Sequence, residues 1–573
     1  MGRLKASFLG DAARLAWPYW NSDEKWSARG LLAAVIVLNL VAVWLNVRLN
    51  LWNRDFYDAL QEYDWARVWW QFGVFCMIAT AWVAVAVYNL YLRQILHIRW
   101  RRWMTERFLR NWLDARAYYR IQLDQSTTDN PDQRISDDLD RYTSLSLTLS
   151  LGLLDSVVTL CSFLFILWRI SGVLAVPLPG GGSFDLPGYL VFVAIVYASL
   201  GSWLTHWIGS PLAALVFDQQ RYEADFRFSM VRLRENAESV AFYRGEEREY
   251  GVFDRRFGRV VSNWWDIIRR RKKLTWFTAS YNQVAVIVPV VAAMPQFFAK
   301  KIQLGGVMQI ISAFGQVQDS LSYIVSSYTE IAEYRAVVAR LSSFGGRIAN
   351  IAAEQQGAQP IDIEQAGEGV EVRGLRLDLP DGQNLREDIA LAADPRHPVL
   401  ITGPTGAGKS TLLRAIAGLW PFGEGKVRVG DGSMMFLPQR PYLPLGPLAD
   451  ALVYPGQATP QRREELEAAL LAVGLSYLAA HLDETSNWSQ RLSIGEQQRI
   501  GFARVLLARP EIVFLDEATS ALDEAGEAAL YRMLREAEWR PTIVSVGHHA
   551  TLRRYHDEIV DLGHRGITEA AEG

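Results

Sequence analysis

The sequence predicts two domains of different fold class: an α-helical domain with six membrane spans, followed by an α/β domain built around a phosphate-binding loop. Apolar stretches of the roughly 20 residues that a span requires occur only before residue 331. Of the 21 Trp residues, 18 lie before residue 346, where interfacial aromatic belts would need them. Residues 403–410 then match the phosphate-loop spacing G-x-x-x-x-G-K-[ST].

Length and composition agree with this division. A chain of 573 residues exceeds the about 250–300 residues at which single cores stop growing. The net charge of −3 argues against a nucleic-acid partner, which would favour a basic surface. We expect an N-terminal interfacial segment at 1–28, the membrane domain at 29–345, a linker rich in Ala, Gln and Gly at 346–368, and the α/β domain at 369–573.

The six predicted spans lie near 30–50, 70–91, 145–168, 189–210, 277–298 and 305–330, and the last is the most polar. Eight arginines follow the second span, whereas the loop after the first span is acidic. The positive-inside rule therefore predicts that the loops at 92–144 and 211–276 and both termini are cytoplasmic. We expect a multi-pass protein of a lipid bilayer.

Polar residues in spans three and six recur every three or four positions, which places them on one stripe of each helix. Lipid cannot solvate them, so they face either other helices or a wet cavity. Hydrogen bonding between helices is an equally good explanation for the small Ser and Thr residues. The carboxylates favour a hydrophilic chamber, because each would cost about 2.5–3.5 kcal/mol in lipid. The predicted chamber residues are Asp155, Gln309, Gln316, Asp319, Tyr323 and Glu330.

The phosphate loop predicts binding of a nucleoside triphosphate and Mg²⁺. Its glycines allow backbone N–H groups to turn toward phosphates, and the helix that follows adds its positive end. We expect Lys409 to reach the β- and γ-phosphates and Ser410 to offer its hydroxyl to Mg²⁺. The predicted phosphate-binding residues are Gly403, Pro404, Thr405, Gly406, Ala407, Gly408, Lys409, Ser410 and Thr411.

A second acidic element follows four apolar residues, Ile512 to Leu515, that are typical of a buried strand. Asp516 at its end is expected to hold Mg²⁺ directly or through water. The next residue, Glu517, is placed to orient and polarise an attacking water.

Further motifs resemble those of ABC transporters. Leu492-Ser-Ile-Gly-Glu-Gln497 resembles the ABC signature, Ser520–Asp523 the D-loop, Gln439 the Q-loop glutamine and His548 the switch histidine. The resemblance implies an ABC exporter-type membrane fold and an ATP hydrolase coupled to transport. In it Glu517, His548 and Gln439 are catalytic, and Gln439 joins Ser410 and Asp516 at Mg²⁺. It also implies a homodimer in which Ser493, Gly495, Glu496 and Asp523 contact the ATP held by the other copy.

Two departures from the common ABC pattern concern nucleotide binding. Ile494 and Glu496 replace the Gly and Gln of the common signature. No Phe, Tyr or Trp occurs between Ile361 and Ile401, where many relatives carry an aromatic residue that stacks on adenine. An aliphatic contact near Leu379 is the expected replacement.

The segments 130–135 and 235–246 resemble those of peroxisomal class D half-transporters and bacterial BacA/SbmA-related transporters with a fused ATPase. The bacterial resemblance implies an inner-membrane protein that imports hydrophilic or cationic cargo, such as peptides, cobalamin or bleomycin-like compounds, by alternating access. Two alternatives stay open: export of acyl-CoA or another amphiphile, and a non-transporting ABC ATPase that acts as a sensor or regulator. A mostly apolar chamber with a basic mouth would favour the export of amphiphiles.

Overall fold

The computed structural model describes residues 2–123, 130–177, 183–357 and 361–563. The chain divides into two compact units. A membrane unit contains residues 1–114 and 129–348, and an ATPase unit contains residues 115–128 and 349–573. Parts of the predicted linker and of the C-terminal end lie outside the described residues.

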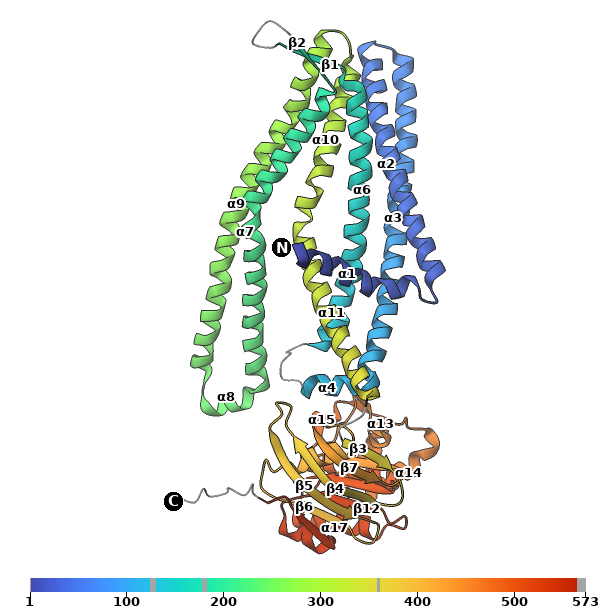
Figure 1. Cartoon of the computed structure of the whole chain (residues 1–573), viewed down its shortest axis with the longest axis vertical. Coiled ribbons are helices and arrows are strands. Elements are labelled where there is room, and N and C mark those ends of the chain that lie inside the picture. The colour runs from blue at the N-terminus through green and yellow to red at the C-terminus, as the bar shows by residue number, and fades with distance from the viewer. Residues whose placement is uncertain (1, 124–129, 178–182, 358–360, 564–573) are drawn as a thin grey trace. The chain divides into compact units, whose positions relative to one another are not determined.

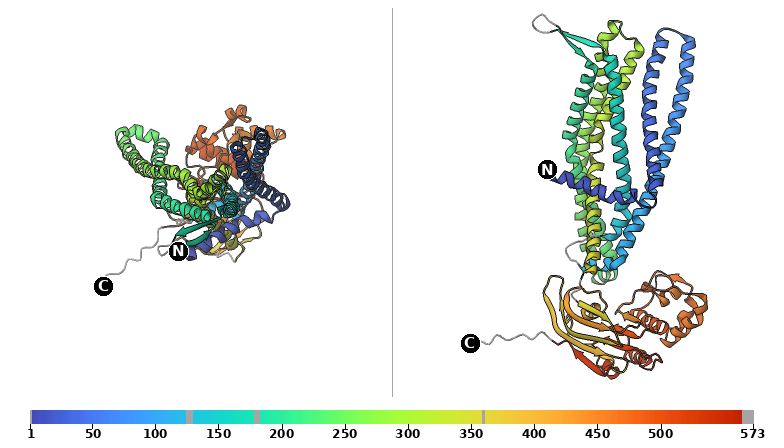
Figure 2. Two further views of the ribbon diagram at one scale, coloured as in Figure 1. Left: turned by 90° about the horizontal axis from the view of Figure 1, so that it is seen from above. Right: turned by 45° about the vertical axis from the view of Figure 1, so that its right-hand side comes forward.

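The membrane unit consists of long helices (Figures 1 and 2). The helices that contain the six predicted spans are α2 (Lys25–Gln61), α3 (Trp65–Leu113), α6 (Leu139–Ser171), α7 (Tyr189–Glu235), α9 (Glu246–Phe298) and α10 (Leu304–Ser326). The remaining helices are α1 (Gly2–Trp20), α5 (Pro131–Gln133), α8 (Ala237–Tyr243) and α11 (Tyr328–Gln356), whose last residues belong to the ATPase unit. Strands β1 (Val173–Pro177) and β2 (Ser183–Pro187) form an antiparallel pair.

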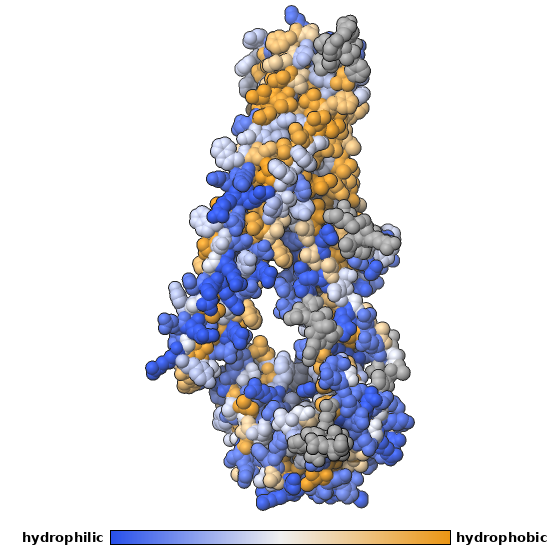
Figure 3. Space-filling view, turned by 60° about the vertical axis from the view of Figure 1, so that its left-hand side comes forward, coloured by the Kyte–Doolittle hydropathy of each residue, from blue (hydrophilic) through white to orange (hydrophobic). Residues whose placement is uncertain are grey.

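Five of these helices are long and apolar enough to cross a membrane, namely α2, α3, the helix ending in α6, α7 and α9. Hydrophobic residues gather over the upper part of the long helices, and hydrophilic residues cover their lower part (Figure 3). The sixth predicted span corresponds to α10, whose 23 residues are also long enough to cross. Gln309, Gln316 and Asp319 lower its mean hydropathy, so composition alone does not select it.

Helix α1 packs against the membrane unit through specific contacts. Tyr19 is fully buried and stacks on Trp100 of α3 at 5.7 Å between ring centroids. The hydroxyl of Tyr142 on α6 donates a hydrogen bond to the carbonyl oxygen of Ala12 at 2.8 Å. The segment predicted to be interfacial is therefore anchored to α3 and α6.

The ATPase unit contains two large sheets. The parallel one has the strand order β13-β6-β12-β11-β8 and the other has the order β3-β7-β4-β5. The strands are β3 (Ile361–Gln365), β4 (Val370–Asp378), β5 (Asn384–Ala393), β6 (Val399–Thr402), β7 (Gly423–Val429), β8 (Met434–Leu437), β9 (Gly446–Pro447), β10 (Thr485–Ser486), β11 (Ile512–Asp516), β12 (Thr542–Val546) and β13 (Glu558–Asp561). Its helices are α4 (Ala117–Leu123), α12 (Lys409–Ile416), α13 (Leu448–Val453), α14 (Arg463–Ala472), α15 (Trp488–Arg491), α16 (Ile494–Ala508) and α17 (Glu524–Arg535).

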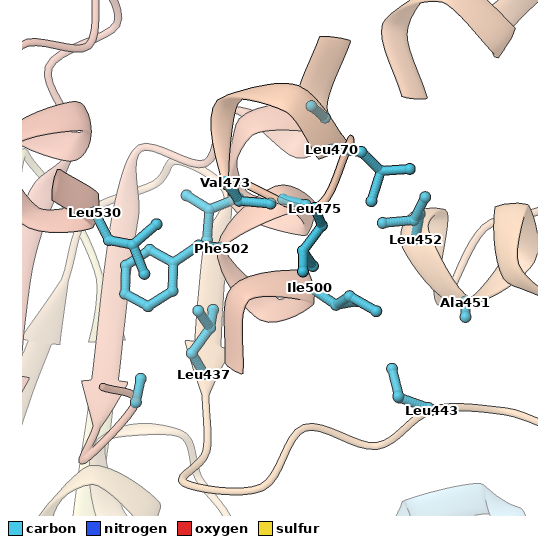
Figure 4. Close-up of a cluster of buried hydrophobic side chains, with 14 of the residues drawn as sticks. Leu437, Leu443, Ala451, Leu452, Leu470, Val473, Leu475, Ile500, Phe502 and Leu530 are labelled. Atoms are coloured by element: carbon cyan, nitrogen blue, oxygen red, sulfur yellow. The ribbon is translucent and has the colours of Figure 1, made fainter. Parts of the chain in front are cut away.

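Two hydrophobic cores hold this unit together. One lies mainly between the two large sheets and contains α12, and the other surrounds α16. In the second core, Phe502 of α16 lies between Leu530 of α17 and Leu437 of β8 (Figure 4). Each buried side chain of this size contributes about 1.5–3 kcal/mol relative to exposure. This packing fixes α16, which carries the signature, against the parallel sheet.

The ATPase unit also includes the short helix α4 from the segment between α3 and α6. Leu123 packs against the core that contains α12, and the guanidinium of Arg116 donates to the carbonyl oxygen of Ala417 at 3.0 Å. The predicted linker, 346–368, contains the end of α11 and strand β3, which pairs with β7. The ATPase sheet thus takes in residues before the predicted boundary at 369.

Candidate ATP-hydrolysis site

Four neighbouring strands of the parallel sheet place the predicted site residues at one edge. The phosphate loop follows β6, Gln439 follows β8, Asp516 and Glu517 end or follow β11, and His548 follows β12. In parallel α/β sheets, ligands bind outside the carboxyl ends of the strands. The topology therefore brings together residues that are up to 145 positions apart in the chain.

The phosphate loop has the backbone conformation that its glycines allow. Gly406 and Gly408 have φ angles of +84° and +90°, which strain other residues. A Cβ on Gly408 would also lie 3.1 Å from Leu385 Cδ2. The ammonium of Lys409, which is 6% exposed, donates to the carbonyl oxygens of Gly403 at 2.8 Å and Pro404 at 3.0 Å. Leu385 therefore packs beside this loop, and an adenine contact near Leu379 stays a prediction.

The hydroxyl of Ser410 donates a hydrogen bond to Asp516 Oδ1 at 2.8 Å. Burial raises the pKa of the Asp516 carboxyl, and the nearby charge of Glu517 adds to this rise. A cation beside this carboxylate would oppose the rise. A hydroxyl and a carboxylate are oxygen ligands of the kind that Mg²⁺ prefers. The donor set of Ser410 and Asp516 therefore fits the predicted metal.

The three predicted catalytic residues meet at the carboxylate of Glu517. Gln439 Nε2 donates to Glu517 Oε2 at 3.2 Å, and His548 Nε2 lies 3.3 Å from Glu517 Oε1. Glu517 has a φ angle of +50°, a conformation that non-glycine residues rarely adopt, and its N–H bonds to the carbonyl oxygen of Val546 at 3.0 Å. Such backbone strain clusters at functional sites. Gln439 contacts Glu517 rather than Asp516, so these contacts do not place it with the predicted metal ligands.

The signature forms the N-terminus of α16. Ser493 caps the helix in a capping box with Glu496, because Ser493 Oγ accepts from the Glu496 N–H while Glu496 Oε2 accepts from the Ser493 N–H at 2.8 Å. The Ser493 hydroxyl also lies 2.7 Å from Glu496 Oε2, and Glu496 accepts a short hydrogen bond from Tyr477. The bond from Tyr477 lowers the pKa of Glu496, and burial raises that of Tyr477 to about 12.

The signature also contacts the D-loop of the same chain. A Cβ on Gly495 would lie 3.0 Å from the carbonyl oxygen of Ala521, so a side chain there would crowd the loop. Asp523 caps α17 by accepting from the Gly526 N–H at 3.1 Å. Among the described residues, no recorded hydrogen bond or ion pair joins the signature to the phosphate loop of the same chain.

Sequence reasoning missed Gln498, which is 1% exposed and links three motifs. Its Nε2 donates to the carbonyl oxygen of Gln439 at 3.0 Å, to Ser520 Oγ at 3.2 Å and to the carbonyl oxygen of Glu517 at 3.4 Å. Its Oε1 accepts from the Ala521 N–H at 3.0 Å. Gln497 and Gln498 are both buried on α16, and buried amides of this kind need hydrogen-bond partners.

Glu527 on α17 was also missed. It is 1% exposed and accepts hydrogen bonds from the hydroxyls of Thr519 at 2.8 Å and Thr551 at 2.6 Å. His549 Nδ1 lies 3.0 Å from the same carboxylate. Glu527 therefore ties the segment after β11 to the segment after β12, close to Glu517 and His548.

The predicted chamber residues of the membrane unit divide into two groups. Tyr323 is engaged in helix packing: its hydroxyl donates to the carbonyl oxygen of Leu149 at 3.2 Å, and a Cβ on Gly152 would lie 2.4 Å from it. Gln309 is 2% exposed, and its backbone carbonyl accepts from Asn50. In the described part of the chain, no hydrogen bond or ion pair is recorded for the side chains of the other four residues, Asp155, Gln316, Asp319 and Glu330.

The fold and the site define a membrane-bound ATPase of the phosphate-loop class. The family model described as ABC transporter transmembrane region 2 matches residues 17–298, and the model described as ABC transporter matches residues 387–520. The chain therefore belongs to the ABC transporter family, and it is a multi-pass membrane protein with a fused ATP-binding domain.

Curated relatives agree over nearly the whole chain. An uncharacterized ABC transporter ATP-binding protein of Haemophilus influenzae is 35% identical over 93% of this chain and 88% of its own length. The chloroplastic ABC transporter D family member 2 of Arabidopsis thaliana is 33% identical over 96% and 85%, respectively. The lysosomal cobalamin transporter ABCD4 of Homo sapiens is 26% identical over 98% and 95%. The predicted similarity to class D transporters is confirmed.

A solved structure supports the exporter-type fold. It is described as a bacterial Atm1-family ABC exporter with ATP bound, with a TM-score of 0.71, 17% identity and 93% coverage of each chain. At that identity the likeness concerns the fold alone. It confirms the predicted fold class, and the family models with the class D relative confirm an ATPase activity coupled to transport.

Proposed function

We propose that two copies of this chain form an ATP-driven transporter that imports hydrophilic cargo by alternating access. The observation that carries the ATPase part is the cluster at Glu517, where Gln439 and His548 lie on opposite oxygens of one carboxylate. Glu517 acts as the general base that orients the attacking water, and His548 contacts the transferred phosphate. Gln439 reports the state of this site to the membrane unit.

ATP binds along the phosphate loop, residues 403–411. Lys409, already directed toward the loop carbonyls, provides a positive charge for the β- and γ-phosphates. Ser410 and Asp516 would hold Mg²⁺, and the side-chain oxygen of Gln439 would be a third ligand if it turned away from Glu517. The metal neutralises charge on the phosphates when it is bound.

A second copy completes each ATP site. The signature residues Ser493, Gly495 and Glu496, with Asp523, have no recorded contact with their own phosphate loop, and they are free to face that of another copy. Helix α8, at the end of the α7–α9 hairpin, carries Phe242 and Tyr243, which are 79% and 86% exposed. An exposed aromatic pair of this kind favours burial against a partner, which supports the homodimer.

Three carboxylates support hydrophilic or cationic cargo. Asp155 lies on α6, Asp319 on α10 and Glu330 on α11. Helix α10 packs against α6 and is followed in the chain by α11. No ion pair is recorded for these three carboxylates in the described residues. Carboxylates in a span face water or a partner rather than lipid. A relative named as a cobalamin transporter is consistent with polar cargo. The arginine-rich loops support a cytoplasmic position for both termini and the ATPase unit. A relative of Escherichia coli named as an inner membrane ABC transporter ATP-binding protein is consistent with a bacterial inner membrane.

One observation favours a second candidate, the export of an anionic amphiphile. A cavity of about 750 Å³ among α2, α6 and α10 is lined mainly by aliphatic and aromatic side chains, with Arg54 and Arg169 as its charged groups. An apolar wall with basic residues suits an acyl chain that carries an anionic head.

Transport by the full chain in sealed proteoliposomes tests both candidates. Labelled cobalamin, a labelled cationic peptide and an acyl-CoA are offered on each side of the membrane with Mg²⁺ and ATP. We expect Glu517→Gln to bind ATP but to lose about 10²–10⁴-fold in ATP turnover, and to lose transport with it. Glu465→Gln, at an exposed ion pair of α14, is the matched control and should behave as wild type.

The outcomes separate the two candidates. Movement of cobalamin or peptide toward the side of the membrane that carries the ATPase unit supports import. Movement of acyl-CoA away from that side supports the second candidate. Wild-type ATP turnover in Glu517→Gln would refute the assignment of the base.

A further inference from the structure

A cavity of about 440 Å³ lies where α7 and α9 meet α10 and the start of α11. It is bordered by two basic side chains, Arg271 of α9 and His206 of α7, and by several hydroxyl groups. Ser202 of α7 and Ser322 of α10 approach each other here, with their Oγ atoms 3.3 Å apart. No Asp or Glu occurs among the described residues that line it.

The positive charge of this cavity extends along α9. Arg271 is the centre of five consecutive basic residues, Arg269 to Lys273. Arg269 forms an ion pair with Asp266 at 3.0 Å, whereas Arg271 and Lys273 have no recorded acidic partner in the described chain. The run therefore keeps unneutralised charge beside the cavity.

Exposed tryptophans place the cavity at the level of lipid headgroups. Trp207, next to His206, is 67% exposed, and Trp276, five residues after Arg271, is 72% exposed. Trp side chains concentrate at membrane–water interfaces, and basic residues concentrate on the cytoplasmic side. Both α7 and α9 contain apolar stretches long enough to cross a membrane, so each helix continues from this level into the bilayer.

We propose that this cavity binds the phosphate headgroup of an anionic phospholipid from the cytoplasmic leaflet. The phosphate would contact the Arg271 guanidinium, with the hydroxyls of Ser202, Thr205 and Ser322 as donors to the remaining oxygens. Basic pockets between spans on the cytoplasmic side are suited to such headgroups. The aliphatic side chains of Leu212 and Leu274 in the lining provide an apolar exit for the acyl chains.

The position of the cavity gives the bound lipid a structural role. Helix α10 ends at Ser326, α11 begins at Tyr328, and the ring of Tyr328 contacts His206 edge-on at 5.5 Å between centroids. The α7–α9 pair packs against α10, and its α8 end lies apart from α11 (Figure 1). A headgroup in the cavity would bridge the hairpin to the α10–α11 turn.

Lipid binding to the full chain tests the proposal. The protein is reconstituted in phosphatidylcholine that contains a minor fraction of spin-labelled phosphatidylglycerol, and the motionally restricted fraction is measured by electron paramagnetic resonance. Each basic residue near a membrane surface contributes about 1 kcal/mol to anionic lipid binding, which corresponds to about five-fold. We expect Arg271→Gln to weaken selectivity for phosphatidylglycerol by about five-fold or more, and Arg271→Lys to restore most of it.

Two matched variants separate the cavity from general surface charge. Lys273→Gln removes the same charge two residues away, outside the cavity lining, and should have a clearly smaller effect. Ala213→Trp keeps every charge but fills the cavity, and should weaken binding as strongly as Arg271→Gln. Wild-type ATP binding by each variant shows that it has folded, and lipid selectivity is measured independently of transport.

Three results would overturn the proposal. Equal losses in Arg271→Gln and Lys273→Gln would assign the selectivity to diffuse attraction by the basic run. Unchanged binding in Ala213→Trp would exclude the cavity. Full competition by inorganic phosphate, without selectivity for phosphatidylglycerol over phosphatidylcholine, would identify a site for free phosphate rather than for lipid.

Discussion

The ATPase unit and the membrane unit use polar residues in different ways. In the ATPase unit, hydrogen bonds connect functional groups that are distant in the chain, such as Ser410 with Asp516 and Gln439 with Glu517. In the membrane unit, some polar residues of the predicted chamber serve helix packing instead, as Tyr323 does against α6. A parallel sheet gathers motif residues at one edge, whereas a polar helix stripe serves either packing or a chamber. Four predictions test this contrast.

The largest effect is expected in the membrane unit, at a buried ion-pair cluster. The carboxylate of Asp138, 3% exposed, contacts Arg134 at 2.8 Å and Arg340 of α11 at 2.6 Å. Asp138→Ala would leave two arginines without this partner and should cost about 3–5 kcal/mol of stability. Thermal unfolding of the full chain, followed by tryptophan fluorescence, measures the change.

Asp140→Asn is the control for this prediction, since Asp140, two residues further along the chain, is only half-buried and lies beside Arg101 and His97. We expect it to cost less than about 1 kcal/mol. Equal losses of stability in the two variants would show that the ion pairs of Asp138 stabilise the protein no more than those of Asp140.

The next effect is expected at Gln498. Gln498→Leu removes the buried link among the Q-loop, the Glu517 backbone and the D-loop, and leaves buried polar groups unsatisfied at about 1–3 kcal/mol each. If Gln498 positions Glu517, kcat for ATP hydrolysis should fall about ten-fold or more while KM for ATP changes little. Gln490→Leu, at an exposed residue of α15, should leave both constants near wild type. Parallel loss of folding and activity would indicate a structural role only.

A smaller effect separates packing from chamber residues in the membrane unit. Asp319→Asn should lower transport of a cationic cargo several-fold, because it removes a charge that no recorded ion pair neutralises in the described chain. Tyr323→Phe should leave transport within about two-fold and lower stability by about 1 kcal/mol, because it removes one hydrogen bond to the α6 backbone. Cargo flux in proteoliposomes and thermal melting measure the two variants. The reverse pattern would place Tyr323, and not Asp319, in the chamber.

The smallest effect concerns pH and His556 in the ATPase unit. Burial lowers the pKa of His556, whose Nδ1 donates to the Leu552 carbonyl and whose Nε2 accepts from Ser545. The unfolded chain therefore binds the proton first, and stability falls as the pH drops below the ordinary value of 6.5. His556→Gln should lower the melting temperature near neutral pH and flatten its decline on acidification. A decline as steep as that of wild type would exclude His556 as its cause.

Much of the ATPase site could be predicted, because each motif combines residue type, spacing and a flanking strand. Lys409, Asp516, Glu517 and His548 all lie where such patterns place them. Gln498 and Glu527 could not be assigned this way, because their roles depend on which loops the folded sheet brings beside their helices.

In the membrane unit, the spans could be predicted from length and apolarity, and even α10 from its helical pattern. The role of each polar residue could not. Gly152 on α6 leaves room for the ring of Tyr323 on α10. The sequence of either helix alone does not show that these two residues pack together. The resemblance to ABC transporters implied the homodimer, whereas nothing in the spacing indicated that residues 115–128 join the ATPase unit.

Because residues 115–128 belong to the ATPase unit, this unit cannot be isolated as one continuous fragment of the chain. Because Leu123 covers part of the hydrophobic interior and Arg116 holds the backbone after α12, a fragment beginning at the end of α11 would lack a piece of its own surface. Such a fragment should aggregate more readily than one supplied with the α4 peptide. Exchanging ATPase modules between related transporters would likewise require moving two separate stretches of sequence together.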